Sequence, residues 1–357
     1  MRPIFDGHLD LALFALAHNR DMTEPAAVSN RREQGMADAL ERGLGAVSLP
    51  DMRRGRIAVC QSSLAARVNR KIRPVSRLDL DFGTQAMAYA NAQGQLAYYR
   101  VLEETGQVAL IRTEKDLDRQ WERWERDSDS ELPVGIIVSM ECADPILGPY
   151  QLEAWWEDGL RSVSLTHFGY GQYAAGTGVE GPLTPRGRQL LSRLAEVGMT
   201  LDVSHLAEES FYDALDHFPG PVIASHNNCR ALVPGDRQLS DQMIRLLVDR
   251  SAVIGSVLDA WMLVPGWVHG KSSPENVTLA DMADHVDHVC QLAGNSLHSA
   301  IGSDVGGLNH MPSDFHTIAD LQKLESILAE RGYSEADLDN IFHANWLRHF
   351  RRWLPES

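Results

Sequence analysis

A histidine and an aspartate two residues apart, His8 and Asp10, follow the apolar residues at positions 3–5. On an extended strand, residues two apart point to the same side, so the imidazole and the carboxylate are offered together. Such a pair forms half of a divalent metal site. The spacing alone is weak, because about two His-x-acid pairs are expected by chance from this composition. The chain has two, and the second, at 285–287, lies in a helical pattern, whereas the first ends a strand.

Later apolar runs also end in polar side chains that can bind metal. Glu141 closes the apolar run 134–140, and a carboxylate there is costly unless a cation or a hydrogen-bond network receives it. The runs 201–205 and 222–226 both end in Ser-His, which predicts two imidazoles on one rim. A Glu that caps a turn and a His that is simply a satisfied polar residue are the alternatives at single positions. The same pattern adds His167 and Asp304.

These residues make up two sets of ligands that share one carboxylate. His8, Asp10 and Glu141 would hold a first ion, and Glu141, His205 and His226 a second. The shell contains nitrogen and oxygen but no sulfur, which suits zinc and also manganese or cobalt. Two such ions, about 3.5–4 Å apart, generate a hydroxide nucleophile at neutral pH. The pattern therefore predicts a hydrolase.

Short apolar runs alternate with longer amphipathic stretches, a pattern typical of parallel βαβ units. Eight or nine strands without a dividing linker favour a closed (β/α)8 TIM barrel of the metal-dependent amidohydrolase-like type, with residues 1–357 as a single domain. The expected strands are Ile4–Asp10, Leu44–Leu49, Val108–Thr113, Val134–Glu141, Ser162–His167, Thr200–His205, Val222–His226, Ala252–Leu258 and Ser299–Asp304. The expected helices are Thr84–Thr105, Thr184–Val197, Ala207–His217, Ser240–Asp249, Leu279–Ala293 and Ser334–Trp353. We expect His285 and His288 to lie on an outer helix surface.

Composition excludes several functions. A net charge of -16 and the scattered Lys and Arg residues argue against a nucleic-acid or anionic-membrane partner. The first residues show no signal peptide, and no stretch reaches the roughly 18 apolar residues of a membrane span. The four cysteines stand singly, which indicates reduced thiols rather than a disulfide framework. We therefore expect a cytoplasmic enzyme.

Taken together, the motifs resemble the renal (membrane) dipeptidase family of M19-type metallopeptidases. The matching stretches occur in the family's order and cover the chain almost from end to end. They are FDGHLD (5–10), SMECAD (139–144), SLTHFGYGQYA (164–174), GPLTPRGRQLLSRLAEVGMTLDVSH (181–205), PVIASHNNCRAL (221–232), DRQLSDQMI (236–244), HVDHVCQLAG (285–294), IGSDVGG (301–307) and NWLRHF (345–350).

The resemblance implies roles for three further residues. His167 would face the substrate and stabilise the tetrahedral oxyanion, and Asp304 would handle the proton near the metal-bound water. Arg237 would grip the substrate carboxylate, with Arg230 as a rival for that role. A guanidinium suits a carboxylate because it donates two parallel hydrogen bonds. One departure is Leu9, which stands where members such as the renal enzyme have Asn.

The function implied is hydrolysis of free dipeptides, including L-Xaa-D-Xaa dipeptides, by attack of metal-bound hydroxide on the peptide carbonyl. The implied cofactors are two zinc ions, and the family also suggests a homodimer. Two alternatives stay open: a related amide or lactam hydrolase on the same metal centre, and a non-catalytic binding protein on a dead barrel.

Overall fold

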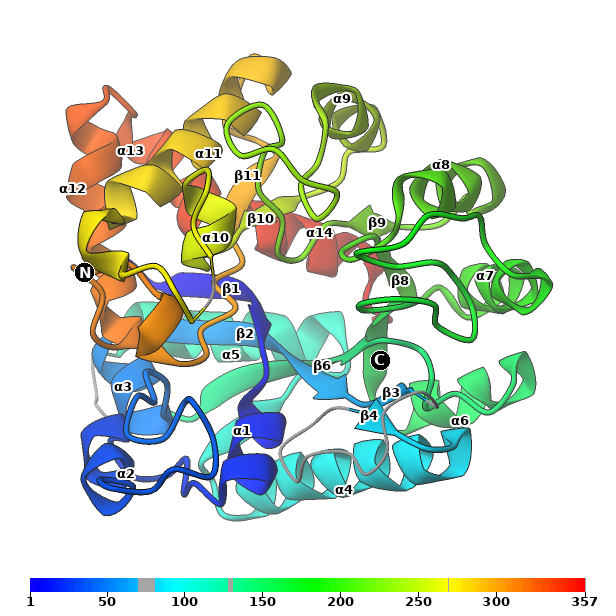
Figure 1. Cartoon of the computed structure of the whole chain (residues 1–357), viewed down its shortest axis with the longest axis horizontal. Helices are drawn as coiled ribbons and strands as arrows, with labels where there is room; N and C mark the ends of the chain where they lie inside the picture. The colour runs from blue at the N-terminus through cyan, green and yellow to red at the C-terminus, as the bar shows by residue number, and fades with distance from the viewer. Residues whose placement is uncertain (70–80, 128–130, 269, 357) are drawn as a thin grey trace.

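The computed structural model describes residues 1–69, 81–127, 131–268 and 270–356. Its centre is a curled parallel sheet ringed by helices (Figure 1). The main sheet has seven strands in the order β1-β2-β6-β7-β8-β9, with β5 paired to β6, and two further pairs are β10-β11 and β3-β4. The strands are β1 (Ile4–Leu9), β2 (Ile57–Ala65), β3 (Arg67–Val68), β4 (Asp81–Phe82), β5 (Val108–Leu110), β6 (Val134–Glu141), β7 (Leu160–Ser164), β8 (Thr200–Asp202), β9 (Val222–Ile223), β10 (Ile254–Ser256) and β11 (Ser299–Ile301).

The prediction of a closed barrel ladder is wrong, because the main sheet stops at β9 and the β10-β11 pair is separate from it. Backbone hydrogen bonds still place this pair between β9 and β1. The Ala224 N–H donates to Val253 O at 2.9 Å, and the Asp304 N–H donates to His8 O at 3.1 Å. The result is an α/β fold with a curled, open parallel sheet.

The carbonyl group of Ser225 lies at the open seam, close to three glycines. An ideal Cβ would lie only 1.8 Å from Ser225 O if built at Gly302, 2.0 Å if built at Gly255 and 2.9 Å if built at Gly7. These three glycines therefore let a main-chain carbonyl enter the space between the strands, where side chains would otherwise pack. Glycine inside a strand commonly marks such a close approach of another backbone segment.

The second strand was also predicted wrongly. Residues 44–49 form no strand, and Ser48 instead caps a helix by accepting a hydrogen bond from Asp51 N. The strand that pairs with β1 is β2, whose nine residues are all buried. Its polar run explains the error, because Gln61 points inward, donates to Gly7 O at 2.9 Å and accepts from Ser162 Oγ at 2.6 Å.

The predicted helices are confirmed near their expected boundaries. The longest begins after Thr84, whose hydroxyl accepts a hydrogen bond from Met87 N, as a side-chain cap should. The predicted helix 334–353 is helical but is interrupted by a π-helical turn. The α-helices are α1 (Leu11–His18), α2 (Ala26–Arg32), α3 (Leu49–Arg54), α4 (Gln85–Glu104), α5 (Glu114–Arg126), α6 (Leu152–Glu157), α7 (Pro185–Val197), α8 (Glu208–His217), α9 (Asp241–Asp249), α10 (Ala260–Leu263), α11 (Leu279–Ala293), α12 (Lys323–Glu330), α13 (Glu335–Asp339) and α14 (Asn345–Trp353). The shorter helical turns are η1 (Pro149–Gln151), η2 (Pro274–Asn276), η3 (Leu308–His310), η4 (Ile318–Gln322) and η5 (Asn340–Ala344).

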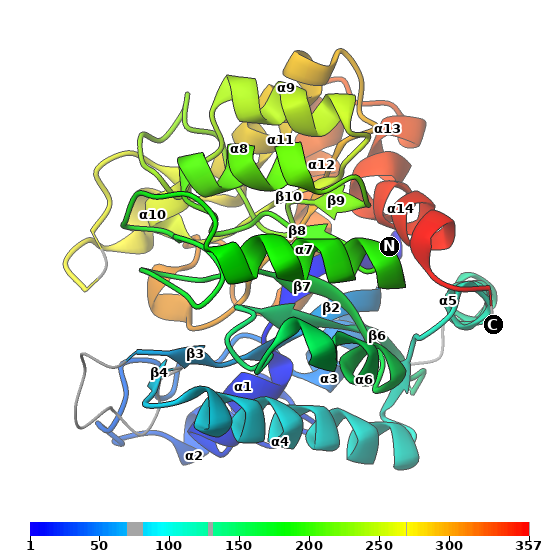
Figure 2. The same ribbon diagram turned by 90° about the vertical axis from the view of Figure 1, so that its right-hand side faces the viewer.

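Figure 2 shows α10 and the β3-β4 pair at one end of the molecule and α14 at the other. On α14, Trp346 donates from its indole to Ile301 O at 2.9 Å and packs where a side chain on Gly7 would lie.

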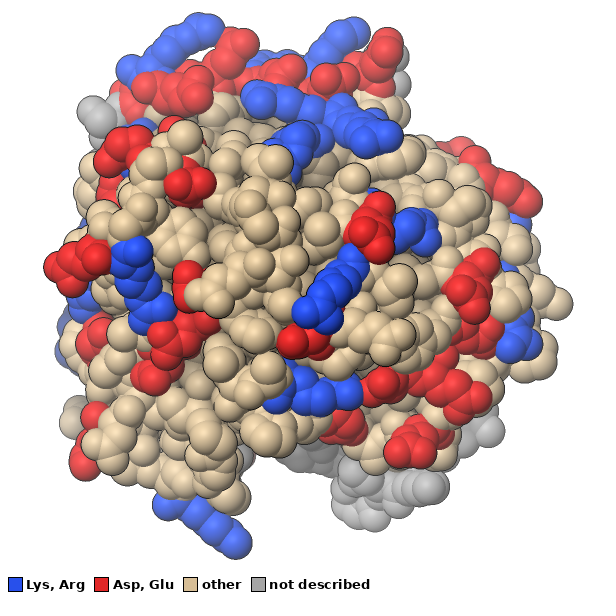
Figure 3. Space-filling view, turned by 90° about the horizontal axis from the view of Figure 1, so that it is seen from above, with Lys and Arg blue, Asp and Glu red and all other residues tan. Residues whose placement is uncertain are grey.

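The face in Figure 3 shows Lys and Arg side chains lying among Asp and Glu side chains. Within the described ranges, no helix combines the length and hydrophobicity that crossing a membrane requires.

Candidate metal centre

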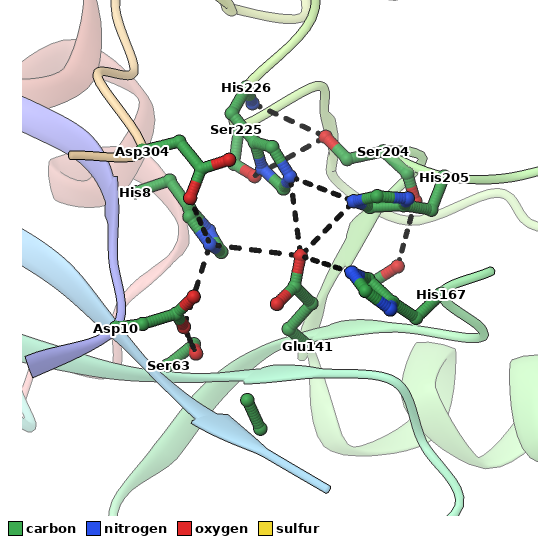
Figure 4. Close-up of polar contacts among 12 residues, drawn as sticks. His8, Asp10, Ser63, Glu141, His167, Ser204, His205, Ser225, His226 and Asp304 are labelled. Carbon is green, nitrogen blue, oxygen red and sulfur yellow. Dashed lines mark hydrogen bonds and ion pairs between the residues drawn. The ribbon is translucent and has the colours of Figure 1, made fainter. Parts of the chain in front are cut away.

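The ends of six strands meet at one cluster of histidine and carboxylate side chains (Figure 4). Parallel strands end on the same rim, so residues far apart in sequence meet there. Three of the histidines follow the last residue of their own strand by three positions, after β7, β8 and β9. The structure brings together all seven residues that were predicted at strand ends: His8, Asp10, Glu141, His167, His205, His226 and Asp304.

Glu141 lies in the middle of this cluster. Its Oε1 is 3.2 Å from His205 Nε2, 3.3 Å from His226 Nε2, 3.7 Å from His167 Nε2 and 3.8 Å from His8 Nε2. The Glu141 side chain is 5 % exposed. One buried carboxylate oxygen therefore faces four imidazoles, which is the arrangement expected of a ligand shared by two cations.

His8 is surrounded by carboxylates on the other side of the cluster. Its Nε2 lies 3.7 Å from Asp10 Oδ1 and 3.8 Å from both Glu141 Oε1 and Asp304 Oδ1. This nitrogen is buried and has no hydrogen-bond partner among the described residues. A buried ring nitrogen without a partner, surrounded by carboxylates, is a position that a cation would satisfy, so the donor set fits a divalent metal ion.

Two ligand triads can be drawn from these positions. One is His8, Asp10 and Glu141, and the other is Glu141, His205 and His226; within each, the ligand atoms lie within 4.8 Å of one another. The two triads share Glu141, as the sequence pattern predicts. Leu9, between two of the predicted ligands, is fully buried in the hydrophobic core and so leaves the ligand set unchanged.

The pKa shifts of the clustered side chains also indicate a site that a cation would stabilise. Burial raises the pKa of the Glu141 carboxyl well above its usual range, and the Asp10 carboxylate raises it further. Burial also raises the pKa of Asp304, to about 7, against the opposing effect of His8. Although burial alone would lower the pKa of His8, the neighbouring Glu141 and Asp10 carboxylates raise it to about 10. Burial lowers the pKa of His205 far below 6.5, which keeps that imidazole neutral, as a metal ligand must be.

Two buried aspartates outside the triads hold the ligand loops in place. Asp202 accepts hydrogen bonds from Ser204 N and Ser225 N, both at 3.0 Å, and from the Ser225 hydroxyl. Asp6 accepts from His8 N at 3.2 Å and from Ser303 N at 2.9 Å. Asp202 thus ties together the loops after β8 and β9, and Asp6 ties β1 to the loop after β11.

Asp202 also lies within 4.8 Å of His8 and His226 in a third possible triad. Because its oxygens already accept three hydrogen bonds, we assign it to support of the ligand loops rather than to coordination.

The backbone is strained at the site. Among the described residues, six non-glycine residues have positive φ, and three of these belong to the cluster or adjoin it: Cys142 at 75°, His205 at 68° and Asp304 at 51°. Such conformations cost free energy and persist where the surroundings impose them, commonly at functional sites. All three positions lie directly after, or three residues after, the carboxyl end of a strand.

Arg237 lies next to the cluster and is 3 % exposed. Its Nη2 donates to His226 O at 2.7 Å, while its buried Nη1 has no hydrogen-bond partner among the described residues. Arg230, the alternative for binding a carboxylate, instead pairs with the exposed Glu208 at 2.5 Å. The geometry thus favours Arg237 as an anion-binding residue.

His167 forms one wall of a cavity of about 410 Å³ beside the cluster. Other walls come from Arg67, Asn69, Phe168 and Tyr170. Phe168 is 43 % exposed and Tyr170 67 % exposed, so this wall is available to a ligand. The sequence pattern located His167 and the loop after it, but not Arg67 and Asn69, which also line this cavity.

Several supporting residues were missed from sequence. Ser63 on β2 donates a short hydrogen bond to Asp10, and Thr177 contacts His205 Nδ1 at 3.1 Å. Asp202 could have been found, since it ends the same apolar run shortly before Ser204 and His205, and an aspartate there commonly accepts a hydrogen bond from a backbone N–H two residues on. The prediction that His285 is an outer-surface residue is wrong: it is buried and accepts a hydrogen bond from Cys229 N at 3.1 Å.

Comparison with known proteins agrees with the resemblance seen in the motifs. The family model of the membrane dipeptidases, peptidase family M19, matches residues 1–353. The chain belongs to this family. Its members are metallopeptidases, and the clustered His, Asp and Glu side chains are of the kind that a metal-dependent member needs.

Curated relatives of this membrane dipeptidase family member match over about half of its length. A protein of Klebsiella pneumoniae, described as an uncharacterized protein in the pqqA 5' region, is 31 % identical over 55 % of this chain and 73 % of its own length. Dipeptidase tcpJ of Claviceps purpurea is 33 % identical over 54 % of this chain and 44 % of its own length. The chain therefore spans less than half of the length of that fungal dipeptidase.

Solved structures of the family share the fold along the whole chain. A dipeptidase of family M19 superposes with a TM-score of 0.79 at 22 % identity, over 99 % of both chains. A metallopeptidase of Rhodobacter sphaeroides, solved with a phosphinate mimic of the dipeptide L-Ala-D-Ala, superposes with a TM-score of 0.77 at 23 % identity, over 98 % of this chain and 99 % of its own.

Proposed function

We propose that this protein is a dipeptidase that hydrolyses free dipeptides with two divalent metal ions, zinc being the ion that the nitrogen and oxygen shell suits best. The observation that carries the proposal is the position of Glu141, with one oxygen 3.2–3.8 Å from four imidazoles. In this proposal His8 and Asp10 complete the first set of ligands, and His205 and His226 complete the second.

Divalent cations in such a shell supply Lewis acidity and lower the pKa of water in the site. The protein's own residues bind and orient the dipeptide. Arg237 receives the C-terminal carboxylate through its unpartnered Nη1, which fixes the scissile carbonyl near Glu141. Phe168 and Tyr170, exposed on the cavity wall, contact a substrate side chain.

Two further residues deal with charge and protons during the reaction. His167 Nε2, 3.7 Å from Glu141 Oε1, donates a hydrogen bond to the carbonyl oxygen as negative charge develops on it. Asp304, whose Oδ1 is 3.8 Å from His8 Nε2, accepts the proton of the attacking water and passes it to the nitrogen of the leaving amino acid. The C–O bond forms first and gives a tetrahedral oxyanion; the peptide C–N bond then breaks as the nitrogen receives the proton, and the two protons of water end on the leaving amine.

The test is metal analysis of the full chain together with hydrolysis of a stereochemically defined panel of dipeptides. The panel includes L-Ala-L-Ala and L-Ala-D-Ala, the second being the dipeptide whose mimic the Rhodobacter sphaeroides protein binds. We expect two equivalents of zinc and turnover of at least one stereochemical class. The Glu141→Gln variant, which keeps the side-chain volume but loses the charge, should lose both metal and activity.

Two other outcomes would replace this function. Hydrolysis of lactams or N-acyl amides without turnover of any dipeptide would indicate a related amide hydrolase on the same centre. Failure to bind zinc, manganese or cobalt after reconstitution would indicate a binding protein without catalysis.

A further inference from the structure

Arg67 contacts His167 through the ring nitrogen that does not face Glu141. The Nη1 of Arg67 lies 3.0 Å from His167 Nδ1, while His167 Nε2 faces Glu141 Oε1 at 3.7 Å. A guanidinium has only N–H donors and stays protonated in proteins. His167 Nδ1 must therefore be the acceptor, which leaves the ring proton of the neutral imidazole on Nε2.

The Arg67 side chain is held in place for this contact by a buried carboxylate. Arg67 and Asp81 are register partners in the β3-β4 pair. The guanidinium binds Asp81 through both Nε and Nη2, the latter at 3.0 Å from Oδ2, and the Asp81 side chain is 1 % exposed. The fork on one carboxylate fixes the plane of the guanidinium, so Nη1 is aimed at His167 rather than free to rotate away.

The two neighbouring imidazoles have the opposite kind of partner. His226 Nδ1 lies 2.7 Å from Ser225 Oγ, and that hydroxyl donates its own hydrogen to Asp202, so it accepts from His226 Nδ1–H. His205 Nδ1 lies 3.1 Å from the Thr177 hydroxyl, which can accept in the same way. A proton on Nδ1 leaves the Nε2 lone pair free, which is the form that binds a metal ion.

We infer that Arg67 is a positioning residue that makes His167 a hydrogen-bond donor and keeps it from becoming a further metal ligand. Three imidazoles approach the same oxygen of Glu141 to within 3.2–3.7 Å, and the partner of Nδ1 decides which of them coordinate. The inference deepens the proposed function and rests on it for the role of the donor. The assignment of the ring proton itself does not depend on that function.

The test reads the ring protons directly. The full chain is labelled with ring-¹⁵N histidine and loaded with zinc, and the His167 signals are identified by their loss in a His167→Gln variant. We expect the proton of His167 on Nε2, and the protons of His205 and His226 on Nδ1. A proton on His167 Nδ1 in the unmodified protein would overturn the inference without any variant of Arg67.

A charge swap then tests whether Arg67 is the cause. The double variant Arg67→Glu and Asp81→Arg keeps an ion pair between the two strands but puts an acceptor beside His167 Nδ1, so the proton should move to Nδ1. Arg67→Lys, which still donates, should leave it on Nε2. If the swap folds and the proton stays on Nε2, Arg67 does not control the tautomer. If the swap does not fold, Arg67→Met gives the test, and an unchanged single Nε2–H form in that variant would refute the inference.

The activity of the variants and a matched control distinguish a positioning role of Arg67 from a general loss of stability. With zinc content unchanged, the swap should lower kcat about 100-fold, as loss of one oxyanion donor does, while KM changes little. Arg20→Met is the control for Arg67→Met, because Arg20 makes a comparable fork on buried Glu33, at 2.8 Å through both Nε and Nη2. It should leave the His167 tautomer and kcat unchanged. Absence of dipeptide turnover in the unmodified protein would refute the proposed function but not the tautomer assignment.

Discussion

Replacing Gly302 by alanine should disturb the candidate metal centre, because Gly302 lies where the β10-β11 pair meets the main sheet, against the backbone of Ser225. A Cβ at this position would lie 1.8 Å from Ser225 O, and the nearby Gly255 backbone, whose Cα is 3.0 Å from that Cβ, closes the other side. Carbon and oxygen atoms normally approach to about 3.3 Å, so one of the two segments has to move by about 1.5 Å. Both neighbours are backbone, so no side chain can rotate out of the way.

The displacement has a cost in stability and a cost in metal binding. Overpacking of a rigid interior typically costs about 1–3 kcal/mol, and the contact here is with backbone, so we expect a value of about 3 kcal/mol. The Ser225 carbonyl belongs to the peptide bond that leads to His226, and the Ser225 hydroxyl contacts His226 Nδ1 at 2.7 Å. Moving this peptide therefore moves a predicted ligand, and zinc affinity should fall at least about tenfold, the lower end of the range for loss of support around a ligand.

Urea unfolding and a zinc competition assay measure the two effects. The matched control is Gly94→Ala in helix α4, where an added Cβ meets no atom within 4 Å. Alanine in a helix interior is favoured over glycine by about 1 kcal/mol, so this variant should be more stable than the parent, with unchanged zinc affinity. A Gly302→Ala protein that unfolds at the parent's urea concentration and binds zinc equally well would refute the argument about the seam.

Three further predictions concern the site itself. Arg237→Ala should lower kcat/KM about 10- to 100-fold, mainly through KM, as expected for loss of a charged hydrogen bond; loss of zinc would instead show that it is structural. Ser225→Ala should weaken zinc binding about 10- to 100-fold by removing the hydroxyl between His226 and its supporting carboxylate, measured by competition with a chelating dye. In the metal-free protein the carboxylates around His8 outweigh burial and raise its pKa to about 10 from 6.5, so the stability gained from its proton is full below pH 6.5 and is lost as the pH rises toward 10. The urea midpoint of the metal-free protein should therefore fall between about pH 7 and pH 9, and a His8→Asn variant that shows the same fall would contradict this reading.

Much of the fold could be predicted because local signals and tertiary packing agree. The helix Leu279–Ala293 was expected from its amphipathic pattern and occurs at those residues. Its ends agree with that pattern, because Thr278 is the N-cap residue and Gly294 follows the helix with φ at 70°. The strand 57–65 was missed for the opposite reason. Its polar residues point into the interior and are satisfied by partners on neighbouring strands, which a pattern of apolar residues cannot reveal.

The open seam was also beyond a sequence pattern. Counting strands favours a closed barrel, but closure depends on whether backbone groups on the last strands meet in register. Here Gly255 and Gly302 admit the carbonyl of Ser225, and a glycine in a sequence does not say which atom will occupy the space it leaves. The burial of His285 could not be predicted for a related reason, because its hydrogen-bond partner, Cys229 N, is 56 residues away in the chain.

The candidate ligands could be located from sequence because parallel strands end on one rim, but their roles could not be separated. His167, His205 and His226 all follow a hydroxyl residue and all stand three positions after a strand. Seen locally they are equivalent, and each approaches Glu141 Oε1 through Nε2. What differs is the group at Nδ1: an arginine for one, and hydroxyls for the other two. Since a guanidinium can only donate and a hydroxyl can accept, we infer that chemically identical side chains become a donor and two ligands.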